Sequence, residues 1–316
     1  MKKSLNIVFM GTPEFAATIL EKIVNSSHNV ISVVTVPDKP AGRGRKPTPS
    51  AVKKTAEKHN LPLLQPSNLK DSVFVNQLKA LHADVFVVVA FRMLPKVVWE
   101  IPPRGTFNLH ASLLPQYRGA APINWALIHG ETKTGVTTFF IDEQIDTGAI
   151  IAKKEIDIEP TDDVKTLHDK LMHLGSALVI ETLDAIAEGV VQPIPQKSNL
   201  QLKEAPKLTP ENTRIDWNLP GKNIVDKIRG LSPFPVAWTL LNNHGESQRI
   251  KLYKAVFEKK EHQEKIGKLI ISKKEIAVAV TDGYVKLNEI QLPGKRRMSA
   301  IDLLNGFSFG ENSYVS

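Results

Sequence analysis

The sequence contains no cysteine, and this absence excludes several kinds of chemistry at once. A chain without cysteine has no disulfides, no thiolate nucleophile and no metal held through sulfur. Long apolar runs are missing as well, because no stretch reaches the roughly 18 apolar residues that a membrane-spanning helix needs. The apolar run at residues 5–10 is too short for a secretion signal. We therefore expect a cytoplasmic protein that is neither membrane-anchored nor stabilised by disulfides.

Two common site motifs are also absent. The strand expected at residues 5–10 is followed by Gly11, Thr12, Pro13 and Glu14, a turn that invites comparison with a dinucleotide fingerprint. Only the first glycine of Gly-x-Gly-x-x-Gly is present, and Pro13 occupies the position of the second. The sequence also lacks the His-Glu-x-x-His pattern of metalloproteases. We therefore expect neither a nicotinamide cofactor nor a bound metal ion.

Strands and helices alternate over the first 189 residues. Such alternation is typical of an α/β domain with a doubly wound, mostly parallel sheet of the Rossmann-like type. A loop that is long for a compact domain interrupts the pattern at residues 37–49. The expected strands cover residues 5–10, 30–36, 85–90, 106–110, 136–141 and 149–153, and the expected helices residues 14–26, 50–60, 67–81 and 163–187.

The remaining residues predict a second domain. Residues 190–209 are rich in proline and polar residues, and we interpret them as an interdomain linker. Residues 210–316 contain one short helix and then closely spaced strands, which is typical of a small antiparallel β-barrel. Two domains, residues 1–189 and 210–316, also fit a length of 316 residues. We interpret Trp217 and Trp238 as core residues of the second domain rather than as stacking platforms.

Positive charge is concentrated in two parts of the chain. Residues 1–189 hold 21 basic and 20 acidic residues, whereas residues 190–316 hold 20 basic and 13 acidic residues. Within the first half, residues 37–58 hold seven basic and two acidic residues. Two basic zones on a nearly neutral body suggest an extended polyanion such as nucleic acid, although a solvated surface that maintains solubility is an equally good interpretation.

Asn108 and His110 are the strongest candidates for catalysis. They lie two residues apart in the strand expected at residues 106–110, so their side chains share one face. An amide beside an imidazole suits a carbonyl carbon under attack, and Asp146 in a later turn is a carboxylate that can orient the imidazole. A lone histidine at a strand end is more often structural, so spacing alone leaves both interpretations open.

The order of the motifs resembles that of a known enzyme family. Asn108-Leu109-His110 is followed by Ser112-Leu113-Leu114-Pro115, by Arg-Gly-Ala-Ala-Pro and by Asp146-Thr147-Gly148. This order is similar to that of the formyltransferases that use 10-formyltetrahydrofolate. The similarity spans nearly the whole chain, resembles most closely the branch that formylates initiator methionyl-tRNA, and implies an OB-like fold for the second domain. The other matching motifs lie at residues 10–15, 214–217, 228–238 and 298–304.

The resemblance implies that Asn108, His110 and Asp146 are the catalytic residues of a formyl transfer. In this reaction an amine attacks the formyl carbon carried by the folate, and negative charge develops on the formyl oxygen. Asn108 and protonated His110 can donate hydrogen bonds to that oxygen, and one such donor contributes about 10²–10³-fold in rate. His110, or a water held by Asp146, can carry the proton from the amine towards the folate nitrogen, which contributes about 10²–10⁴-fold.

The resemblance also indicates two segments of a folate pocket. The first, residues 112–115, matches the folate-binding signature of the family, and the second, residues 91–93, follows the fourth strand. This chain departs from most relatives in the second segment, where they have a glycine and one additional residue, and Ala111 replaces a common glycine. These departures concern the details of the pocket rather than the reaction. The candidate folate-binding residues are Ser112, Leu113, Leu114 and Pro115 in the first segment and Phe91, Arg92 and Met93 in the second.

Two basic clusters are candidate contacts to tRNA. The loop at residues 39–46 resembles an insertion with which the tRNA-formylating members grip the acceptor end, and members that act on small amines lack it. The cluster at residues 295–297 is a candidate for phosphate contacts, which position a nucleic acid without reading its sequence. An ordinary solvated surface also explains either cluster. The candidate residues are Arg43, Arg45 and Lys46 in the first cluster and Lys295, Arg296 and Arg297 in the second.

The expected protein is a monomeric enzyme that transfers a formyl group from 10-formyltetrahydrofolate to the methionine of initiator methionyl-tRNA. The nearest alternative is a formyltransferase for the amine of a sugar nucleotide or ribonucleotide, which would share Asn108, His110 and Asp146. That alternative would need neither the basic loop nor the positive second half. A non-catalytic RNA-binding protein of the same fold is a further alternative, against which the intact set of catalytic residues argues.

Overall fold

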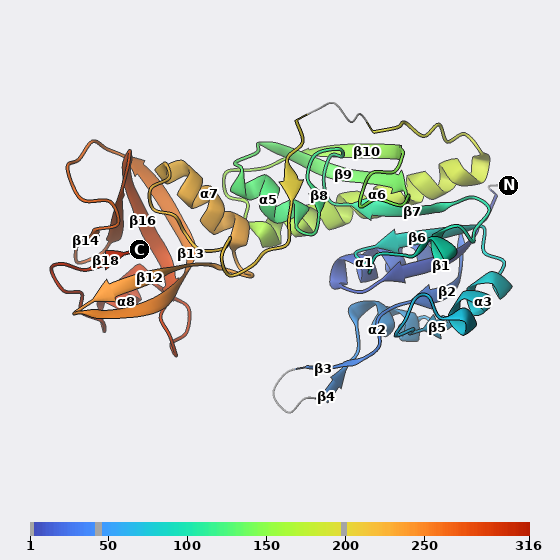
Figure 1. Cartoon of the computed structure of the whole chain (residues 1–316), viewed down its shortest axis with the longest axis horizontal. Coiled ribbons are helices and arrows are strands. Elements are labelled where there is room, and N and C mark those ends of the chain that lie inside the picture. The colour runs from blue at the N-terminus through green and yellow to red at the C-terminus, as the bar shows by residue number, and fades with distance from the viewer. Residues whose placement is uncertain (1–2, 42–45, 197–200) are drawn as a thin grey trace. The chain divides into compact units, whose positions relative to one another are not determined.

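The computed structural model of the chain describes residues 3–41, 46–196 and 201–316, which divide into two units (Figure 1). The units interleave along the chain, and each has a sheet of its own. The domain borders expected at residues 189 and 210 stay a prediction. The first unit consists of residues 1–119, 134–156 and 168–204, and the second of residues 120–133, 157–167 and 205–316.

A seven-stranded sheet organises the first unit. In spatial order its strands are β10 (Ile150–Asp157), β9 (Lys133–Phe140), β7 (Thr106–His110), β6 (Val85–Val89), β1 (Asn6–Gly11), β2 (Asn29–Val34) and β5 (Leu63–Leu64). The five strands from β7 to β5 pair in parallel, and β9 runs antiparallel to β7. The central strands β1 and β6 are buried along nearly their whole length, as expected for parallel strands that are covered on both faces. The carboxyl ends of the parallel strands meet at one edge, which is where open α/β sheets place their sites.

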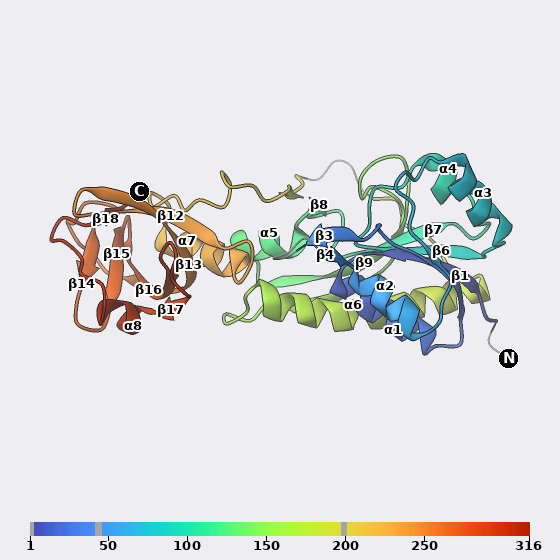
Figure 2. The same cartoon turned by 90° about the horizontal axis from the view of Figure 1, so that it is seen from below.

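Helices cover both faces of this sheet, as Figure 2 shows. One face carries α1 (Glu14–Val24), α2 (Ala51–Lys58) and α6 (Val164–Glu188), and the other carries α3 (Ser72–Ala80) and α4 (Lys96–Trp99). Apolar residues of the strands pack with α3 and α4 into one buried cluster. This arrangement confirms the doubly wound, mostly parallel sheet that the sequence predicts. Within the described parts of the chain, no helix is both long enough and apolar enough to cross a membrane.

Several local elements differ from the expectation. The segment expected to be a loop at residues 37–49 contains a short antiparallel hairpin of β3 (Lys39–Ala41) and β4 (Lys46–Thr48). Helix α3 begins at residue 72 rather than 67, because Asp71 accepts hydrogen bonds from two backbone N–H groups of the first turn and so caps the helix. The short α4 and α5 (Pro122–Ile128) were not predicted, since so few turns show no periodicity.

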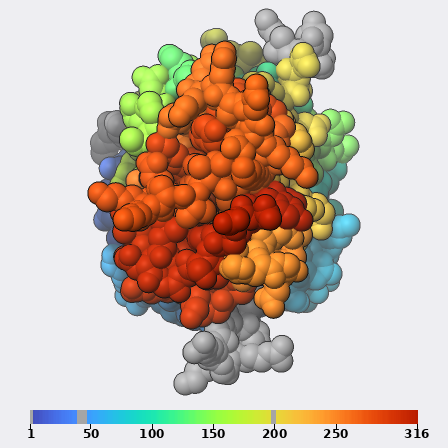
Figure 3. Space-filling view, turned by 90° about the vertical axis from the view of Figure 1, so that its left-hand side faces the viewer, coloured from blue at the N-terminus to red at the C-terminus, as the bar shows by residue number. Residues whose placement is uncertain are grey.

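An antiparallel barrel organises the second unit, and Figure 3 looks onto its surface. In spatial order its strands are β14 (Leu269–Ile271), β15 (Ile276–Val280), β16 (Gly283–Gln291), β13 (Glu246–Lys259), β12 (Ala237–Asn243) and β18 (Tyr314–Val315). The last strand nearly closes the barrel, because β18 pairs with β12 while the backbone N–H of Val315 donates to the carbonyl of Gly267 at 2.8 Å. A Cβ added to Gly267, whose φ is +83°, would lie 2.5 Å from the Val315 oxygen, so this close approach requires glycine.

The core of the second unit is formed by the inner faces of the barrel strands together with α7 (Gly221–Leu231) and α8 (Ala300–Leu304). Strand β12 shows the pattern most clearly, because buried and partly exposed residues alternate along its length. Ser299 caps α8 by accepting a hydrogen bond from the backbone N–H of Asp302. The small antiparallel barrel expected from the closely spaced strands is therefore confirmed.

Candidate active site

Strand β7 carries the first two candidate catalytic residues. Because side chains alternate along a strand, Asn108 and His110 share one face and Leu109 points to the opposite face. There Leu109 packs against α6, since a Cβ added to Gly175 would lie 2.7 Å from Leu109 Cδ2. His110 ends the strand at the carboxyl edge of the sheet. The sequence prediction placed both side chains on this strand with the same bounds.

The imidazole of His110 is held in one orientation by the loop that follows it. His110 is only 7% exposed, and its Nε2 lies 2.8 Å from the carbonyl oxygen of Tyr117. A carbonyl oxygen only accepts hydrogen bonds, so Nε2 must carry a proton in either charge state of the ring. The nitrogen that gains or loses a proton is therefore Nδ1, which lies 3.7 Å from Asp146 Oδ2.

Asp146 reaches His110 from a tight turn. Its backbone has a φ of +57°, a left-handed conformation that aspartate tolerates better than most residues. The backbone N–H of Gly119 donates to Asp146 Oδ2 at 2.9 Å and fixes the carboxylate. The Asp146 side chain is 12% exposed, so water screens little of the attraction between the carboxylate and a charged imidazole.

Asn108 presents a polar atom that the protein does not use. Its Oδ1 is buried and has no hydrogen-bond partner among the described residues. Leaving a buried acceptor unpaired costs about 1–3 kcal/mol, so such atoms are rare and mark functional groups when they occur in a site. The structure thus brings His110 and Asp146 together and leaves the amide of Asn108 available on the same strand face.

The loop after β7 is fixed by hydrogen bonds from its neighbours. Ser112 Oγ donates to the carbonyl of Gln116 at 2.7 Å, and Thr137 Oγ1 donates to the carbonyl of Ser112 at 2.7 Å. Thr137 Oγ1 also accepts from the backbone N–H of Leu114 at 3.2 Å. The side chains of Ser112 and Leu114 are fully buried, so they hold the loop in shape, whereas the other two side chains of residues 112–115 are partly exposed. Contact of this segment with folate stays a prediction.

Comparison with known proteins identifies the family. Residues 4–183 match the family described as Formyl transferase, and residues 207–308 match the formyl transferase C-terminal domain. The chain is 55% identical over 313 residues to the methionyl-tRNA formyltransferase of Flavobacterium johnsoniae, with 99% of each chain covered. The chain belongs to the methionyl-tRNA formyltransferase family. The family member of Bacteroides fragilis is 53% identical over 315 residues, which cover 98% of this chain and 97% of that relative.

Solved structures share the fold of the family. An N-formyltransferase from Helicobacter canadensis, in complex with folinic acid and dTDP-3-aminofucose, superposes with a TM-score of 0.67 at 18% identity, covering 90% of this chain and 98% of that chain. HypX from Aquifex aeolicus, in complex with tetrahydrofolic acid, superposes with a TM-score of 0.63 at 18% identity, covering 95% of this chain and 47% of that chain. At this identity the likeness shows a common fold, which agrees with the fold class predicted from the sequence.

Lys153 on β10 supports the loop and was missed by the sequence reasoning. Its Nζ donates a short hydrogen bond to the carbonyl of Leu114. Partial burial of the ammonium lowers the pKa of Lys153, although the residue as a whole is exposed. The neighbouring Lys154 points to the other face, where it pairs with Glu181 of α6. No sequence pattern distinguishes these two adjacent lysines, because only the strand register decides which of them faces the loop.

We expect Lys153→Met to raise the KM for the formyl donor about tenfold while kcat stays within threefold, because a hydrogen bond to a charged group contributes roughly 1.5–3 kcal/mol. The Leu114 carbonyl then lacks its partner and the loop loses its fixed position. Steady-state kinetics with the donor varied measures the change. Lys154→Met is the matched control, since its partly exposed ion pair contributes little. Equal KM values for the two variants would contradict this role of Lys153.

The second candidate folate segment is tied to the loop before α3. Arg92 donates from Nη2 to the carbonyl of Pro66 at 2.7 Å and from Nη1 to that of Ser67 at 3.0 Å. Its guanidinium also lies 5.2 Å from the centre of the Phe91 ring, and burial lowers its pKa. Met93 is 68% exposed. The hydrogen bonds of Arg92 thus tie this segment to the loop before α3. Contact of residues 91–93 with folate stays a prediction.

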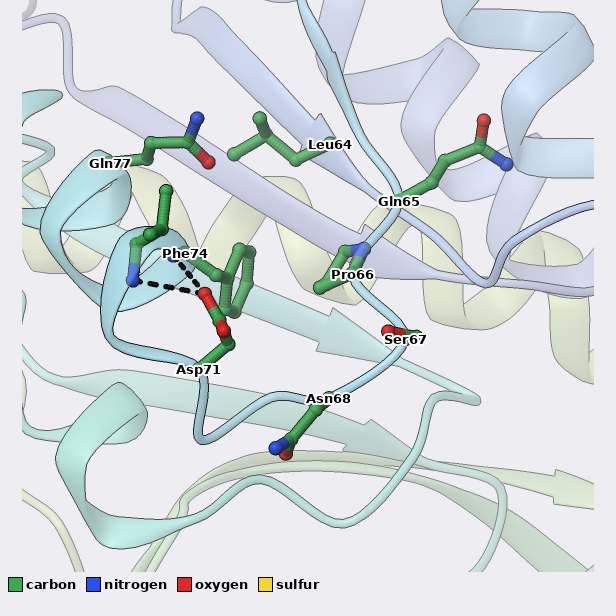
Figure 4. Close-up of a pocket in the computed structure, with 9 residues that line it drawn as sticks. Leu64, Gln65, Pro66, Ser67, Asn68, Asp71, Phe74 and Gln77 are labelled. Carbon is green, nitrogen blue, oxygen red and sulfur yellow. Dashed lines mark hydrogen bonds between the residues drawn. The ribbon is translucent and has the colours of Figure 1, made fainter.

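A hollow of about 330 Å³ lies beside the same loop, and Figure 4 shows residues that line it. Some of its polar side chains form hydrogen bonds within the protein. Asp71 accepts from the backbone N–H groups of Val73 and Phe74, and Gln65 donates to Asp38 and to a backbone carbonyl. These hydrogen bonds cap α3 and hold the loop before it. Among the described residues, no cluster of three or more histidine or acidic side chains is placed to hold a metal ion.

The first basic cluster is only partly described. Arg43 and Arg45 lie outside the described residues, and Lys46 is the first residue of β4. Their contact with tRNA therefore stays a prediction made from the sequence. The structure does show that the flanking residues form the two strands of a hairpin, which brings the ends of the basic loop together.

The second basic cluster, residues 295–297, is exposed on the barrel. Arg297 is already engaged, because it pairs with Glu289 and lies 4.5 Å from the centre of the Tyr253 ring. Lys295 accepts a hydrogen bond from Gln291 through its backbone carbonyl, and its side chain is exposed. Phosphate contacts from this cluster remain a prediction.

One of the two tryptophan interpretations is wrong. Trp217 is buried in the barrel core at 4% exposure, as expected. Trp238 is only partly buried, because it occupies an outward position of the alternating strand β12. Its ring lies 4.0 Å from the Arg249 guanidinium and 5.5 Å from that of Arg214, so it stacks with cations on the surface instead of packing in the core.

Proposed function

We propose that this chain transfers the formyl group of 10-formyltetrahydrofolate to the amino group of methionine on initiator methionyl-tRNA, which yields N-formylmethionyl-tRNA for translation initiation. The relatives from Flavobacterium and Bacteroides carry the name methionyl-tRNA formyltransferase. The single observation that carries the chemistry is the pairing of His110 with Asp146 beside the unused amide oxygen of Asn108. The folate compounds bound to the Helicobacter and Aquifex proteins support a folate as the donor.

The unpaired amide oxygen of Asn108 fits an amine substrate. A neutral α-amine brings N–H donors into the site, and Asn108 Oδ1 is a buried acceptor without a partner among the described residues. The reference pKa of an α-amine is about 7.7–8.0, so an appreciable fraction is neutral near pH 7. The enzyme therefore needs to bind and orient the amine more than it needs a strong base to deprotonate it.

His110 and Asp146 divide the proton chemistry between them. Because Tyr117 holds the Nε2 proton, the Nδ1 proton is the one that can move or donate. The 3.7 Å separation between Nδ1 and Asp146 exceeds a hydrogen bond, which leaves the Nδ1 proton free to donate to the formyl oxygen as its negative charge develops. Asp146 stabilises the charged imidazole and holds the water that carries the amine proton to the leaving nitrogen.

We propose a tRNA as the substrate that receives the formyl group because of where positive charge is concentrated in the chain. Residues 190–316 hold 20 basic and 13 acidic residues, and such an excess favours contact with a phosphate backbone. We propose that residues 1–189 carry the reaction, that residues 190–209 link the domains, and that residues 210–316 bind tRNA backbone in a monomer that works in the cytoplasm. The proposed tRNA contacts are Arg43, Arg45, Lys46, Lys295, Arg296 and Arg297.

We expect the double variant Arg43→Ala/Arg45→Ala to lower kcat/KM for initiator methionyl-tRNA at least tenfold while the KM for the formyl donor stays unchanged. Each lost phosphate contact also makes the logarithmic dependence on salt shallower, by about one unit for each arginine. Formylation rates measured over a range of KCl concentrations give both quantities.

The matched control is Lys22→Ala/Lys79→Ala, which removes the same charge from exposed positions on α1 and α3. This control should retain the wild-type kcat/KM within twofold. Wild-type tRNA formylation by the arginine double variant would contradict the role of the loop. Faster formylation of an amino sugar nucleotide than of methionyl-tRNA by the unmodified enzyme would contradict the proposed acceptor.

A further inference from the structure

The proline-rich segment that the sequence presents as a linker contacts the loops of the site at several points. Its residue Ile194 forms an antiparallel bridge with Ile150 at the start of β10. Further along, Lys203 donates from its backbone to Gln116 Oε1 at 2.7 Å and accepts from the backbone N–H of Tyr117 at 2.6 Å. Tyr117 is the residue whose carbonyl holds His110. The described part of this segment therefore holds the loops of the site in place through these contacts, and it does more than connect two domains.

Gln196 makes the most specific of these contacts. Its Nε2 donates to the backbone carbonyl of Asp146 at 2.9 Å and to that of Gly148 at 2.8 Å. Its Oε1 accepts from Arg118, at 3.1 Å from Nε and 2.6 Å from Nη2. Carbonyl oxygens only accept and a guanidinium only donates, so these partners fix which end of the amide is which. Both amide protons and the amide oxygen are thus used within the site loops.

These contacts act on the backbone of Asp146. Its left-handed conformation is uncommon for a residue with a side chain, and it persists only where the surroundings hold it. Gln196 donates hydrogen bonds to the carbonyls of Asp146 and Gly148, on either side of Thr147. The backbone N–H of Gly119, next to Arg118, donates to the Asp146 carboxylate. Main chain and side chain of Asp146 are therefore held by one connected network.

We infer that Gln196 is a positioning residue for Asp146, an inference that rests on the catalytic role proposed for that carboxylate. It touches no reacting atom, and it acts by keeping Asp146 Oδ2 at its distance from His110 Nδ1. A displacement of about 1 Å at such a position costs up to roughly 10²-fold in rate. Loss of Gln196 therefore lowers kcat and leaves substrate binding nearly unchanged.

A double-mutant cycle tests this inference. Gln196→Met keeps the size of the side chain and removes its hydrogen bonds, and it should lower kcat by roughly 10- to 100-fold with both KM values within threefold of wild type. In the background of Asp146→Asn, which lowers kcat by itself, adding Gln196→Met should change kcat less than twofold. A residue that acts only through Asp146 has nothing further to lose once that carboxylate is gone.

Two further variants complete the experiment. Gln196→Glu keeps the size of the side chain and the acceptor for Arg118, but it replaces the donating amide nitrogen with an acceptor. It should therefore lower kcat in the wild-type background and change kcat less than twofold in the Asp146→Asn background. Gln192→Met is the control, because Gln192 is exposed on the same segment and should behave as wild type. Thermal unfolding of every variant shows that the chains are folded.

The outcomes separate the inference from the function on which it rests. Equal losses from Gln196→Met in both backgrounds would overturn the inference, since they would show a general structural role. Wild-type kcat in Gln196→Met and Gln196→Glu, together with a defective Asp146→Asn, would overturn the inference and leave the proposed function intact. Wild-type kcat in Asp146→Asn would overturn both.

Discussion

His110→Asn is expected to lower kcat for formyl transfer by about 10³-fold, within the range that a positioned acid–base group contributes. The variant keeps a polar side chain at the carboxyl end of β7 but removes the only ring nitrogen that can exchange a proton there. Its shorter amide takes the place of the ring Nδ1 and does not reach the Tyr117 carbonyl that Nε2 binds. The loop after β7 should still keep its shape, because Ser112 and Thr137 hold it through hydrogen bonds of their own. The loss should therefore fall on kcat, with the KM values for donor and tRNA changed by less than threefold.

The measurement is single-turnover formylation at saturating donor, which separates the chemical step from substrate binding. His244→Asn is the control, because His244 is exposed in a turn of the second unit with a φ of +51°, a conformation that asparagine adopts readily. The control should match wild type. A kcat for His110→Asn within threefold of wild type would remove His110 from the mechanism, and with it the central part of the proposed function.

Gly148→Ala is expected to lower kcat at least 10²-fold and to cost about 1–3 kcal/mol of folding free energy, as overpacking of a tight site does. The Cβ of an alanine would lie 1.7 Å from the carbonyl oxygen of Phe140, which is backbone and cannot swing aside. The turn must therefore move, and the same turn carries Asp146 and accepts the hydrogen bond from Gln196.

Thermal unfolding and formylation kinetics on the same preparation distinguish the two effects. Gly306→Ala is the control, because a Cβ at Gly306 meets no atom within 4 Å and its backbone needs no left-handed conformation. That variant should keep the wild-type rate and stability. A Gly148→Ala variant with wild-type kcat would show that the position of the Asp146 turn does not limit the reaction.

The strand that carries the candidate catalytic residues could be predicted from the sequence, whereas the contacts that hold the site could not. Asn108 and His110 were placed correctly because strand alternation is a local property, and local rules fix which residues share a face. Lys153 and Gln196 were missed because their partners lie 39 and 48 to 50 residues away, and no local pattern records such contacts. Both are polar residues of ordinary appearance, one in a strand and the other in a proline-rich segment.

The error at Trp238 has a similar cause. Large aromatic residues are usually counted towards a core. Trp217 lies in a turn and packs into the barrel core, whereas the register of β12 places Trp238 on the outward face. The unpaired oxygen of Asn108 could not be predicted from the sequence either. A residue type can suggest an active amide, but only the packing around it shows that no neighbour has taken its acceptor.

The contacts that Ile194, Gln196 and Lys203 make with the site have a practical consequence for protein engineering. Proline-rich stretches between folded regions are the customary places for affinity tags, fluorescent-protein insertions and circular permutation, because they usually tolerate a break. Here an insertion next to Gln196 would disturb the turn that carries Asp146, the proposed catalytic carboxylate. We therefore expect a fusion made at that point to fold but to have little activity. Exposed positions such as the β12–β13 turn at Gly245 are the better choice, since the space beside the Gly245 backbone is open.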